Sequence, residues 1–483
     1  MFDLILRGGD VIDGTGAARY RADVAVQGGE IVFIGDAVGQ RAHRDLDVAG
    51  MVVAPGFIDS HAHDDRAVLE MPGMAPKISQ GVTTVVNGNC GISLAPYKQS
   101  GGDPPLPLRT VDPQWRFAAF GHYLDALDAT PAAVNVASLV GHTALRAVHQ
   151  ADLDRPATEA EVEAMRQAAN AALEQGAIGM STGTFYPPAA SAPTEEIIGV
   201  GRDLKQFGGV YATHMRTEGD GVIEAIEESA QIARALDVRL VISHHKVIGK
   251  PNFGRTRETL ARIGELGRSQ KICLDCYPYT ASSSLLRAER LAISDEILIT
   301  YSRSEPKSAG RKLSDLAQEW QCSRAEALAR VMPGMGMYFF MDEGDVQRVL
   351  AYRDTMIGSD GIPSDDYPHP RLWGTFTRLL GHYSRDLGLL TLEQTVHKMT
   401  GMTAHAFGLA GRGEIREGHA ADITVFDPRT VKDVATYLDP RQPSAGIARV
   451  FVNGQAVWEH GAATGIRPGQ SLRRRARNTT STS

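Results

Sequence analysis

Two histidines stand one residue apart in the stretch GFIDSHAHDD, residues 56–65. In a β-strand the side chains of residues i and i+2 lie on one face, so His61 and His63 have the spacing to hold one metal ion. The competing interpretation is a polar strand end where histidine is simply tolerated. Further potential metal ligands also follow apolar runs: Cys90 in VVNGNC, His214 in VYATH, His244 and His245 in VISHHK, and Asp360 in MIGSD. Whether these groups meet depends on the elements that carry them.

Eight short runs rich in Val, Ile and Ala recur from about residue 50, and a helical stretch follows each. They begin at residues 51, 81, 133, 176, 208, 238, 271 and 354. The runs are mostly continuous rather than alternating, which is typical of parallel strands covered by helices. Between the third and fourth runs, Thr158 and Glu161 form a T-x-x-E capping box that predicts a helix start, and Gly176 is placed to end that helix. Eight such units predict an α/β fold, a (β/α)8 TIM-type barrel with its active site at the C-terminal ends of the strands.

The two ends of the chain show a different pattern. Residues 1–57 read as antiparallel strands with a hairpin at Gly28-Gly29, and the C-terminal part has a hairpin turn at Asn453-Gly454. We expect residues 1–57 and 412–483 to form one small β-sandwich domain, its basic end at 473–477 being a solvated tail. The barrel then covers 58–411. Residues 281–340, between strands seven and eight, are too long for a simple connection and predict an inserted, lid-like segment over the barrel mouth.

In a barrel of this kind the candidate ligands converge, because each of them follows the C-terminal end of a strand. Imidazole, thiolate and carboxylate together suit Zn²⁺ better than Mg²⁺ or Ca²⁺, which prefer oxygen ligands. Singly, Cys90 reads equally well as a small buried hydrophobe, His214 as a core histidine and Asp360 as a helix cap. As a set they predict a zinc site. His244 and His245 point to opposite faces, so only one of them binds, and we choose His244.

Bulk properties exclude several classes of protein. A chain of 483 residues with 43% hydrophobic and 22% charged residues buries a large core, and a formal net charge of −7 argues against a nucleic-acid partner. The sequence has no basic leader followed by an apolar stretch and no run long enough to span a membrane, so we expect a cytoplasmic protein. Four cysteines do not make a disulfide framework, and the C-x-x-C of Cys273 and Cys276 lies within a predicted strand, where packing is its expected role.

The motif GFIDSHAH, the strand-five and strand-six histidines and the final Ser-Asp of MIGSD resemble the amidohydrolase superfamily, which is built on a metal-bearing (β/α)8 barrel. Hydantoinase-like members bridge two metals with a carboxylated lysine on strand four, but the corresponding run GAIGMSTG contains no lysine. Cys90 supplies an anion at the end of strand two instead. With ATHMR, SHHK, YPY and YPHPRLWG, the whole chain resembles the N-acyl-D-amino acid deacylases (D-aminoacylases), which act on small-molecule N-acyl-D-amino acids.

The resemblance implies a zinc tightly held by Cys90, His214 and His244, and a second, weaker site formed by His61 and His63 with Asp360. Zinc lowers the pKa of bound water from about 16 to near 7, which makes a nucleophile available at neutral pH. Asp360 is the expected catalytic base, which deprotonates the water and passes the proton to the leaving amine.

A free carboxylate on the substrate calls for cations and hydroxyls. We expect Lys246 and Arg371 to bind it, with Tyr277 and Ser283 as further contacts implied by the resemblance. Surface ion pairing, core packing and a turn are the competing roles for these four residues.

The resemblance also implies an apolar pocket for hydrophobic D-amino acids formed by Phe185, Tyr338 and Met341. Arg287 and Arg290 in LLRAER open a second possibility, a D-glutamate or D-aspartate side chain. The same residues are compatible with an amidohydrolase that acts on a different amide, and with a relative without activity that keeps the barrel for binding.

Overall fold

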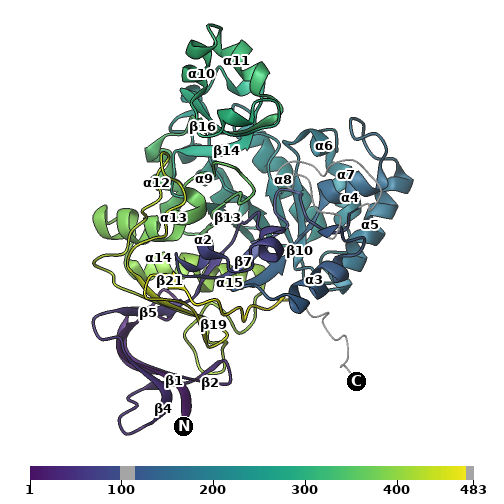
Figure 1. Ribbon diagram of the computed structural model, residues 1–483. Helices are drawn as coiled ribbons and strands as arrows, with labels where there is room; N and C mark the ends of the chain where they lie inside the picture. The colour runs from purple at the N-terminus through teal and green to yellow at the C-terminus, as the bar shows by residue number, and fades with distance from the viewer. Residues whose placement is uncertain (98–114, 475–483) are drawn as a thin grey trace, which may run out of the picture.

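The computed structural model describes residues 1–97 and 115–474 (Figure 1). Its central part contains two parallel sheets. One has the order β17 (Thr355–Ile357), β13 (Ile272–Cys276), β12 (Leu240–Ile242), β11 (Val210–His214), β10 (Gly179–Gly183) and β9 (Val140–Gly141). The other has the order β6 (Phe57–Asp59), β7 (Val82–Asn87) and β8 (Asn135–Ser138).

Hydrogen bonds connect the two sheets at both edges. The amide of Ser60, just after β6, donates to the carbonyl of Ile357 in β17 (3.2 Å), and the amide of Ile178, just before β10, donates to Ser138 in β8 (2.9 Å). Strands β8 and β9 are one run interrupted at Leu139. The eight predicted runs are therefore parallel neighbours in chain order, which confirms the α/β class.

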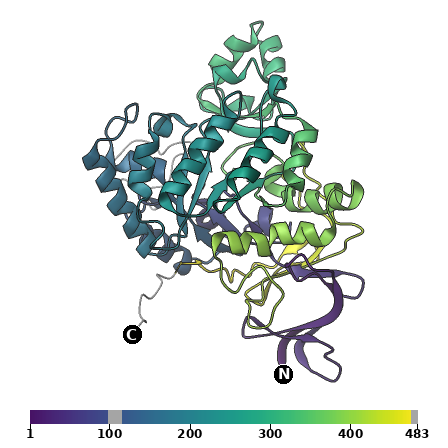
Figure 2. The ribbon, with the colours of Figure 1, turned by 180° about the vertical axis from the view of Figure 1, so that it is seen from behind.

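Helices cover the outside of these strands, as the view from behind shows (Figure 2). Helix α5 begins at the predicted capping box, in which the Glu161 amide donates to Thr158 Oγ1 (3.3 Å). The helices around the parallel strands are α1 (Ala67–Glu70), α2 (Ala75–Ile78), α3 (Phe120–Ala129), α4 (His142–His149), α5 (Glu159–Glu174), α6 (Pro187–Ala190), α7 (Thr194–Gly201), α8 (Val222–Leu236), η2 (Lys250–Asn252), α9 (Thr256–Leu266), α12 (Glu343–Ala351), α13 (Arg371–Arg378), η5 (Leu379–Asp386), α14 (Leu392–Met399) and α15 (Gly401–Phe407). No helix in the described ranges has the length and apolar character needed to cross a membrane.

Strands from both ends of the chain share one nine-stranded sheet. Its members are β1 (Phe2–Val11), β2 (Tyr20–Gln27), β3 (Glu30–Gly35), β4 (Ala42–Asp47), β5 (Val52–Pro55), β18 (Ile423–Phe426), β19 (Ile447–Val452), β20 (Gln455–Glu459) and β21 (Ala462–Ala463). The predicted hairpin turns are present: Gly28 and Gly29 join β2 to β3, and Asn453 and Gly454 join β19 to β20, all four with positive φ.

The antiparallel prediction for residues 1–57 is wrong in part. Strand β1 is antiparallel to β2, but its other edge pairs in parallel with β4 over its first half and with β5 over Asp10–Val11. Strand β1 is long enough for β4 and β5 to pair with the same edge one after the other. Both run parallel to β1. Strand β5 then pairs with the C-terminal β18, which joins the two ends of the chain.

Residues 281–340 contribute a separate antiparallel sheet and most of a separate hydrophobic cluster. Strands β14 (Ala281–Leu285), β16 (Gly334–Phe339) and β15 (Glu296–Ser302) form an antiparallel sheet, packed against α10 (Leu313–Glu319) and α11 (Arg324–Val331), with single turns η3 (Ala288–Arg290) and η4 (Pro306–Ser308). The inserted segment starts at the C-terminal end of β13. In both ribbon views it lies at the opposite end of the molecule from strands β1 to β4 (Figures 1 and 2).

Candidate active site

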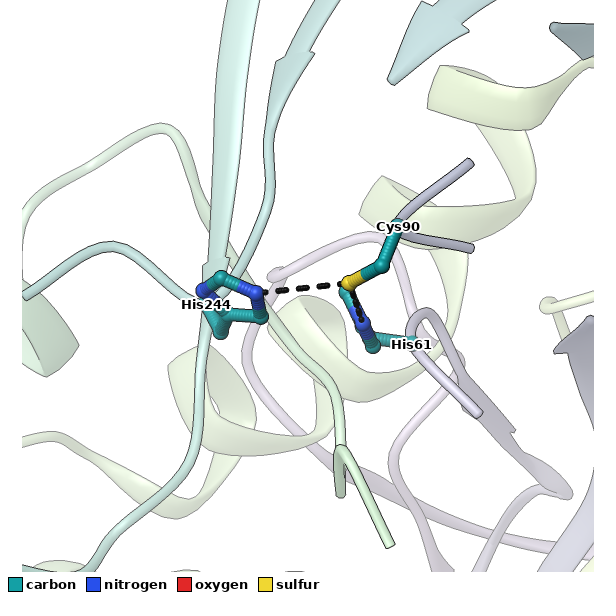
Figure 3. A group of neighbouring side chains, drawn as sticks. All are labelled: His61, Cys90 and His244. Carbon is teal, nitrogen blue, oxygen red and sulfur yellow. Dashed lines mark hydrogen bonds between the residues drawn. The ribbon is translucent and has the colours of Figure 1, made fainter. Parts of the chain in front are cut away.

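Three imidazoles surround the sulfur of Cys90 at the C-terminal ends of the parallel strands. The Cys90 Sγ lies 3.4 Å from His61 Nε2, 3.5 Å from His244 Nε2 and 3.7 Å from His214 Nδ1. Figure 3 shows the thiol of Cys90 between the rings of His61 and His244. His214 is the last residue of β11, the other three follow β6, β7 and β12, and all four are buried. The fold therefore gathers one sulfur and three imidazoles around one point.

A second group of ligands adjoins the first. His63 Nε2 lies 3.2 Å from Asp360 Oδ1, and His61 Nε2 lies 3.6 Å from the same oxygen. His61 thus faces both Cys90 and Asp360, and its nitrogen belongs to both groups of close donors. This arrangement allows two neighbouring ions with His61 between them.

Left-handed backbone conformations place three of these side chains. Cys90, His244 and Asp360 have φ angles of 55°, 37° and 48°. Such conformations are uncommon outside glycine and cost roughly 1–3 kcal/mol each. Each residue lies two or three positions beyond its strand, so the turn of the backbone directs the side chain across the strand ends. Strain concentrated at these positions is characteristic of a functional site.

The electrostatics of the donors fit a cation. Burial alone would raise the pKa of the Cys90 thiol, but the imidazoles of His61 and His244 hold it well below its usual value. A thiolate is the form of cysteine that binds metals. In the described part of the chain, His214 Nε2 and His63 Nδ1 are buried without a hydrogen-bond partner. A sulfur anion, four imidazoles and orphaned ring nitrogens together fit Zn²⁺.

Two carboxylates that the sequence analysis did not single out support the histidines. Glu218 Oε1 lies 3.1 Å from His244 Nδ1, and Asp275 Oδ1 lies 3.4 Å from His61 Nδ1 and accepts the backbone N–H of His244 (2.7 Å). Carboxylates of this kind fix the tautomer and orientation of metal-binding imidazoles. An acidic residue inside the apolar run ICLDC was the available signal for Asp275, and Glu218 lies four residues after His214.

His245 lies outside the cluster. Its Nε2 is 2.8 Å from the hydroxyl of Thr259 in α9, on the outer side of the strands. Successive side chains of this segment thus point in opposite directions, and His244 faces the cluster.

The cations predicted to bind a carboxylate lie at the site but have partners of their own. Lys246 Nζ lies 2.5 Å from Glu218 Oε1 and 2.9 Å from His244 Nδ1. Arg371 Nη1 lies 2.8 Å from Asp360 Oδ2. Burial alone would raise the pKa of Asp360, but the Arg371 guanidinium and the hydrogen bond from His63 hold it well below its usual range. Asp360 is therefore a carboxylate.

Tyr277 lies between these two cations, with its ring centroid 5.6 Å from Lys246 Nζ and 4.5 Å from Arg371 Cζ. The buried hydroxyl of Ser283 has no hydrogen-bond partner in the described residues, and it lines a narrow cavity with Lys246 and Asp360.

The three residues expected to form an apolar pocket each have contacts of their own, and Met341 packs against the hydrophobic cluster that contains Tyr338. The Phe185 ring stacks on His214 (5.4 Å between centroids), and Met341 Sδ lies 4.0 Å from the Tyr277 hydroxyl. Tyr338 is in the core of the insertion and donates its hydroxyl to the Leu285 carbonyl (2.6 Å). Between Phe185 and Tyr338 lies Arg290, with its Cζ 4.5 Å from the first ring and 5.1 Å from the second.

A metal-binding cluster of this composition at the ends of parallel strands is typical of metal-dependent hydrolases. Comparison with known proteins gives the same class. The chain belongs to the amidohydrolase family, whose model matches residues 46–252 and 329–458.

Two curated relatives and two solved structures are similar over nearly the whole chain. The D-aminoacylase of Alcaligenes xylosoxydans xylosoxydans is 54% identical, covering 98% of both chains, and the N-acyl-D-aspartate deacylase of the same organism is 48% identical, covering 97% of this chain and 95% of its own. A D-aminoacylase with a binuclear metal centre, activated by one metal and attenuated by a second, superposes with a TM-score of 0.95 at 55% identity, covering 98% of this chain and all of its own. The N-acyl-D-glutamate deacylase of Bordetella bronchiseptica, in complex with zinc and a phosphonate mimic of the tetrahedral intermediate, has a TM-score of 0.94 at 45% identity, covering 98% and 99%.

Proposed function

We propose that this protein is a zinc-dependent amidohydrolase that cleaves the amide bond of N-acyl-D-amino acids, giving a carboxylate and the free D-amino acid. The observation that carries the proposal is the Cys90 sulfur within 3.4–3.7 Å of ring nitrogens of His61, His214 and His244. The similarity to deacylases of D-amino acids over 98% of the chain supports the substrate class.

Cys90, His214 and His244 are the proposed ligands of a tightly held zinc, and His61, His63 and Asp360 those of a second, weaker site. The one-metal activation of the similar D-aminoacylase supports this division. When bound, zinc supplies Lewis acidity that activates water near neutral pH and polarises the amide carbonyl.

The chain's own residues supply proton transfer and orientation. Asp360 accepts the proton of the attacking water and returns it to the amine nitrogen, which leaves poorly without it. Lys246, Arg371, Tyr277 and Ser283 bind the α-carboxylate. To bind the substrate as well as Asp360, the Arg371 guanidinium must donate to both. Its five N–H donors in a planar fork allow this. Glu218 orients Lys246 and His244 together.

The proposed architecture is a closed (β/α)8 barrel over 58–411, with 281–340 inserted as a lid-like segment, and a β-sandwich formed by 1–57 and 412–483. The parallel order of the eight runs and the hydrogen bond from Ser60, just after β6, to Ile357 in β17 support the closed barrel. The shared sheet of the two ends supports the second domain, although residues 475–483 lie outside the described ranges. The proposed location is cytoplasmic, and the four free cysteines support it.

The preference for hydrophobic side chains stays a prediction, and one observation favours an acidic side chain instead. Arg290 is 4% exposed, its Nε and Nη1 have no hydrogen-bond partner, and it forms no ion pair with the described residues. It lines the same cavity as His214, Lys246 and Asp360. Three aromatic rings stabilise the cation in part, but a buried guanidinium without an anion is costly. A substrate side-chain carboxylate would supply that anion, so D-glutamate or D-aspartate is the second candidate.

Hydrolysis of N-acetyl-D-methionine and its L-enantiomer, by zinc-loaded and chelated protein, tests the reaction. We expect turnover of the D form only, abolished by the chelator. Turnover of the L form, or activity that survives complete removal of the metal, contradicts the proposal. If neither methionine derivative reacts, N-acetyl-D-glutamate and N-acetyl-D-aspartate are tested next, and inactivity on all of them rejects the proposed function.

Substitution of Arg290 separates the two side-chain preferences. If Arg290 binds an acidic side chain, Arg290→Met lowers kcat/KM for N-acetyl-D-glutamate or N-acetyl-D-aspartate by about 10- to 100-fold, the value of one charged hydrogen bond. Activity on N-acetyl-D-leucine stays the same or rises. Arg287→Met is the matched control, because Arg287 already pairs with Glu289. Equal losses on acidic and apolar substrates would exclude the acidic preference.

A further inference from the structure

A buried ammonium group lies behind the second group of ligands. Lys77 of α2 is fully buried, and its Nζ has three oxygen partners: Asp59 Oδ2 (2.6 Å), Ser359 Oγ (2.8 Å) and Asp64 Oδ2 (3.1 Å). The contacts with Asp59 and Ser359 are hydrogen bonds, and the contact with Asp64 is an ion pair. Asp59, Asp64 and Ser359 are at most 1% exposed. The cluster is therefore inaccessible to a substrate.

Each partner of Lys77 is a close chain neighbour of a ligand. Asp59 lies two residues before His61 and accepts its backbone N–H through Oδ1 (3.2 Å). Asp64 directly follows His63, and Ser359 directly precedes Asp360. The backbone N–H and the hydroxyl of Ser359 both donate to Asp59 (2.8 and 2.6 Å). Lys77 thus connects the segment after β6 to the segment after β17.

This connection reaches one group of ligands and not the other. Among the described residues, no hydrogen bond or ion pair of Lys77 reaches Cys90, His214 or His244, or the segments that carry them. Those residues are supported by Glu218 and Asp275 instead. Without Lys77, the buried carboxylates of Asp59 and Asp64 would face each other with no cation between them, and repulsion would drive the two segments apart.

We propose that Lys77 is a positioning residue that sets the separation of His61, His63 and Asp360, and thereby the affinity of the second metal site and the placement of the catalytic base. The inference rests on the proposed function. Residues that orient metal ligands typically change metal affinity or activity by about 10- to 100-fold when they are replaced. Because Asp360 transfers the proton, the effect on catalysis falls on kcat rather than KM.

The test titrates metal-free protein with Co²⁺ and compares Lys77→Met with wild type. Calorimetry counts the ions and their affinities, and the charge-transfer absorption of thiolate-bound Co²⁺ reports the Cys90 site separately. We expect Lys77→Met to bind the second ion about 10- to 100-fold more weakly, with the thiolate band and the first affinity unchanged. With one equivalent of zinc, kcat falls by a similar factor at constant KM.

Lys398→Met is the matched control, because Lys398 is also a buried ammonium. It donates to the carbonyls of Tyr352 and Thr355, at the start of β17 rather than at the end that leads to Asp360. We expect this variant to bind both ions as wild type does. Equal loss of the second ion in both variants, or loss of both ions in Lys77→Met, would show a general effect of destabilisation and overturn the inference.

Ser359→Ala keeps every charge and removes three hydrogen bonds of the hydroxyl, which involve Lys77, Asp59 and the backbone N–H of Gly361. If Lys77→Met does not fold, this variant decides, with a smaller loss of second-ion affinity expected. If Ser359→Ala, or a folded Lys77→Met, binds the second ion with wild-type affinity, the inference about Lys77 is overturned but the proposed function is not. A wild-type protein that binds no Co²⁺ and shows no thiolate band overturns the proposed function as well.

Discussion

At the scale of single residues, Cys90 determines which chemistry the site can perform. Its sulfur faces the three imidazoles directly, and the positive charge around it keeps it ionised. Asp360, a second anion at the site, is paired with Arg371. Among the proposed ligands of the tight site, Cys90, His214 and His244, Cys90 is therefore the one that carries a charge.

Replacement of Cys90 by alanine should abolish tight zinc binding. Because metal activation contributes several kcal/mol to transition-state stabilisation, we expect kcat/KM to fall by roughly 1,000-fold or more. Cys273→Ala is the control: Cys273 is also buried, but burial raises its pKa to about 12 and it lies within β13, away from the ligands. Metal content and kinetics measured on both variants check the expectation, and a Cys90→Ala protein with wild-type zinc content would contradict it.

The residues found from the sequence and those missed differ in a physical way. His61, His214 and His244 were predictable because a side chain that leaves the end of a parallel strand points into a shared space, whatever the details of packing. Glu218, Asp275 and Lys77 were not, because their contacts depend on the rotation of one segment relative to another. Lys77 is a single cation in a short helix, and nothing in APKI distinguishes it from a surface lysine.

At the scale of elements, helix α14 is attached to strand β17 by another buried charge. Lys398 donates to the carbonyls of Tyr352 and Thr355, and its side chain is nearly inaccessible to water. Burial lowers the pKa of Lys398 from 10.5 to about 8. The folded protein therefore holds this proton less tightly than the unfolded chain does.

The sign of the resulting pH dependence follows from proton linkage. Below pH 8 both states are protonated and the cost of the buried charge is constant. Between about pH 8 and pH 10.5 the unfolded chain binds more protons, so stability rises with pH. Denaturant unfolding of chelated protein should show wild type gaining about 2 kcal/mol over Lys398→Met between about pH 7 and pH 10. Parallel pH curves for the two proteins would refute the assignment.

The strands of the terminal sheet mark the limit of prediction at this scale. The residue types at Gly28-Gly29 and Asn453-Gly454 located two hairpins, because a two-residue turn with positive φ makes the two strands that flank it pair with each other. The parallel pairing of β4 and β5 with β1 has no such local signal. Alternation of polar and apolar residues identifies a strand but not its partner or its direction.

At the scale of the whole molecule, the site depends on segments far apart in the chain. His61 and Asp360 are separated by about 300 residues, yet the amide of Asp360 donates to the carbonyl of His61 (2.8 Å). The proposed zinc ligands come from β6, β7, β11, β12 and β17, and no short part of the chain contains a complete set. Bound metal therefore stabilises only the folded arrangement of all these strands.

Stability should accordingly depend on free zinc. A ligand that binds the folded state alone adds about 2.7 kcal/mol at a concentration 100 times its dissociation constant. We expect the free energy of unfolding in denaturant to rise by this amount when chelated wild-type protein is titrated with buffered zinc to that concentration. In Cys90→Ala we expect a rise only at zinc concentrations far above those that stabilise wild type. Cys273→Ala should respond as wild type does, from a slightly lower baseline. The same zinc response in Cys90→Ala and wild type would place the stabilising ion elsewhere on the molecule, because the tight site has no other thiolate.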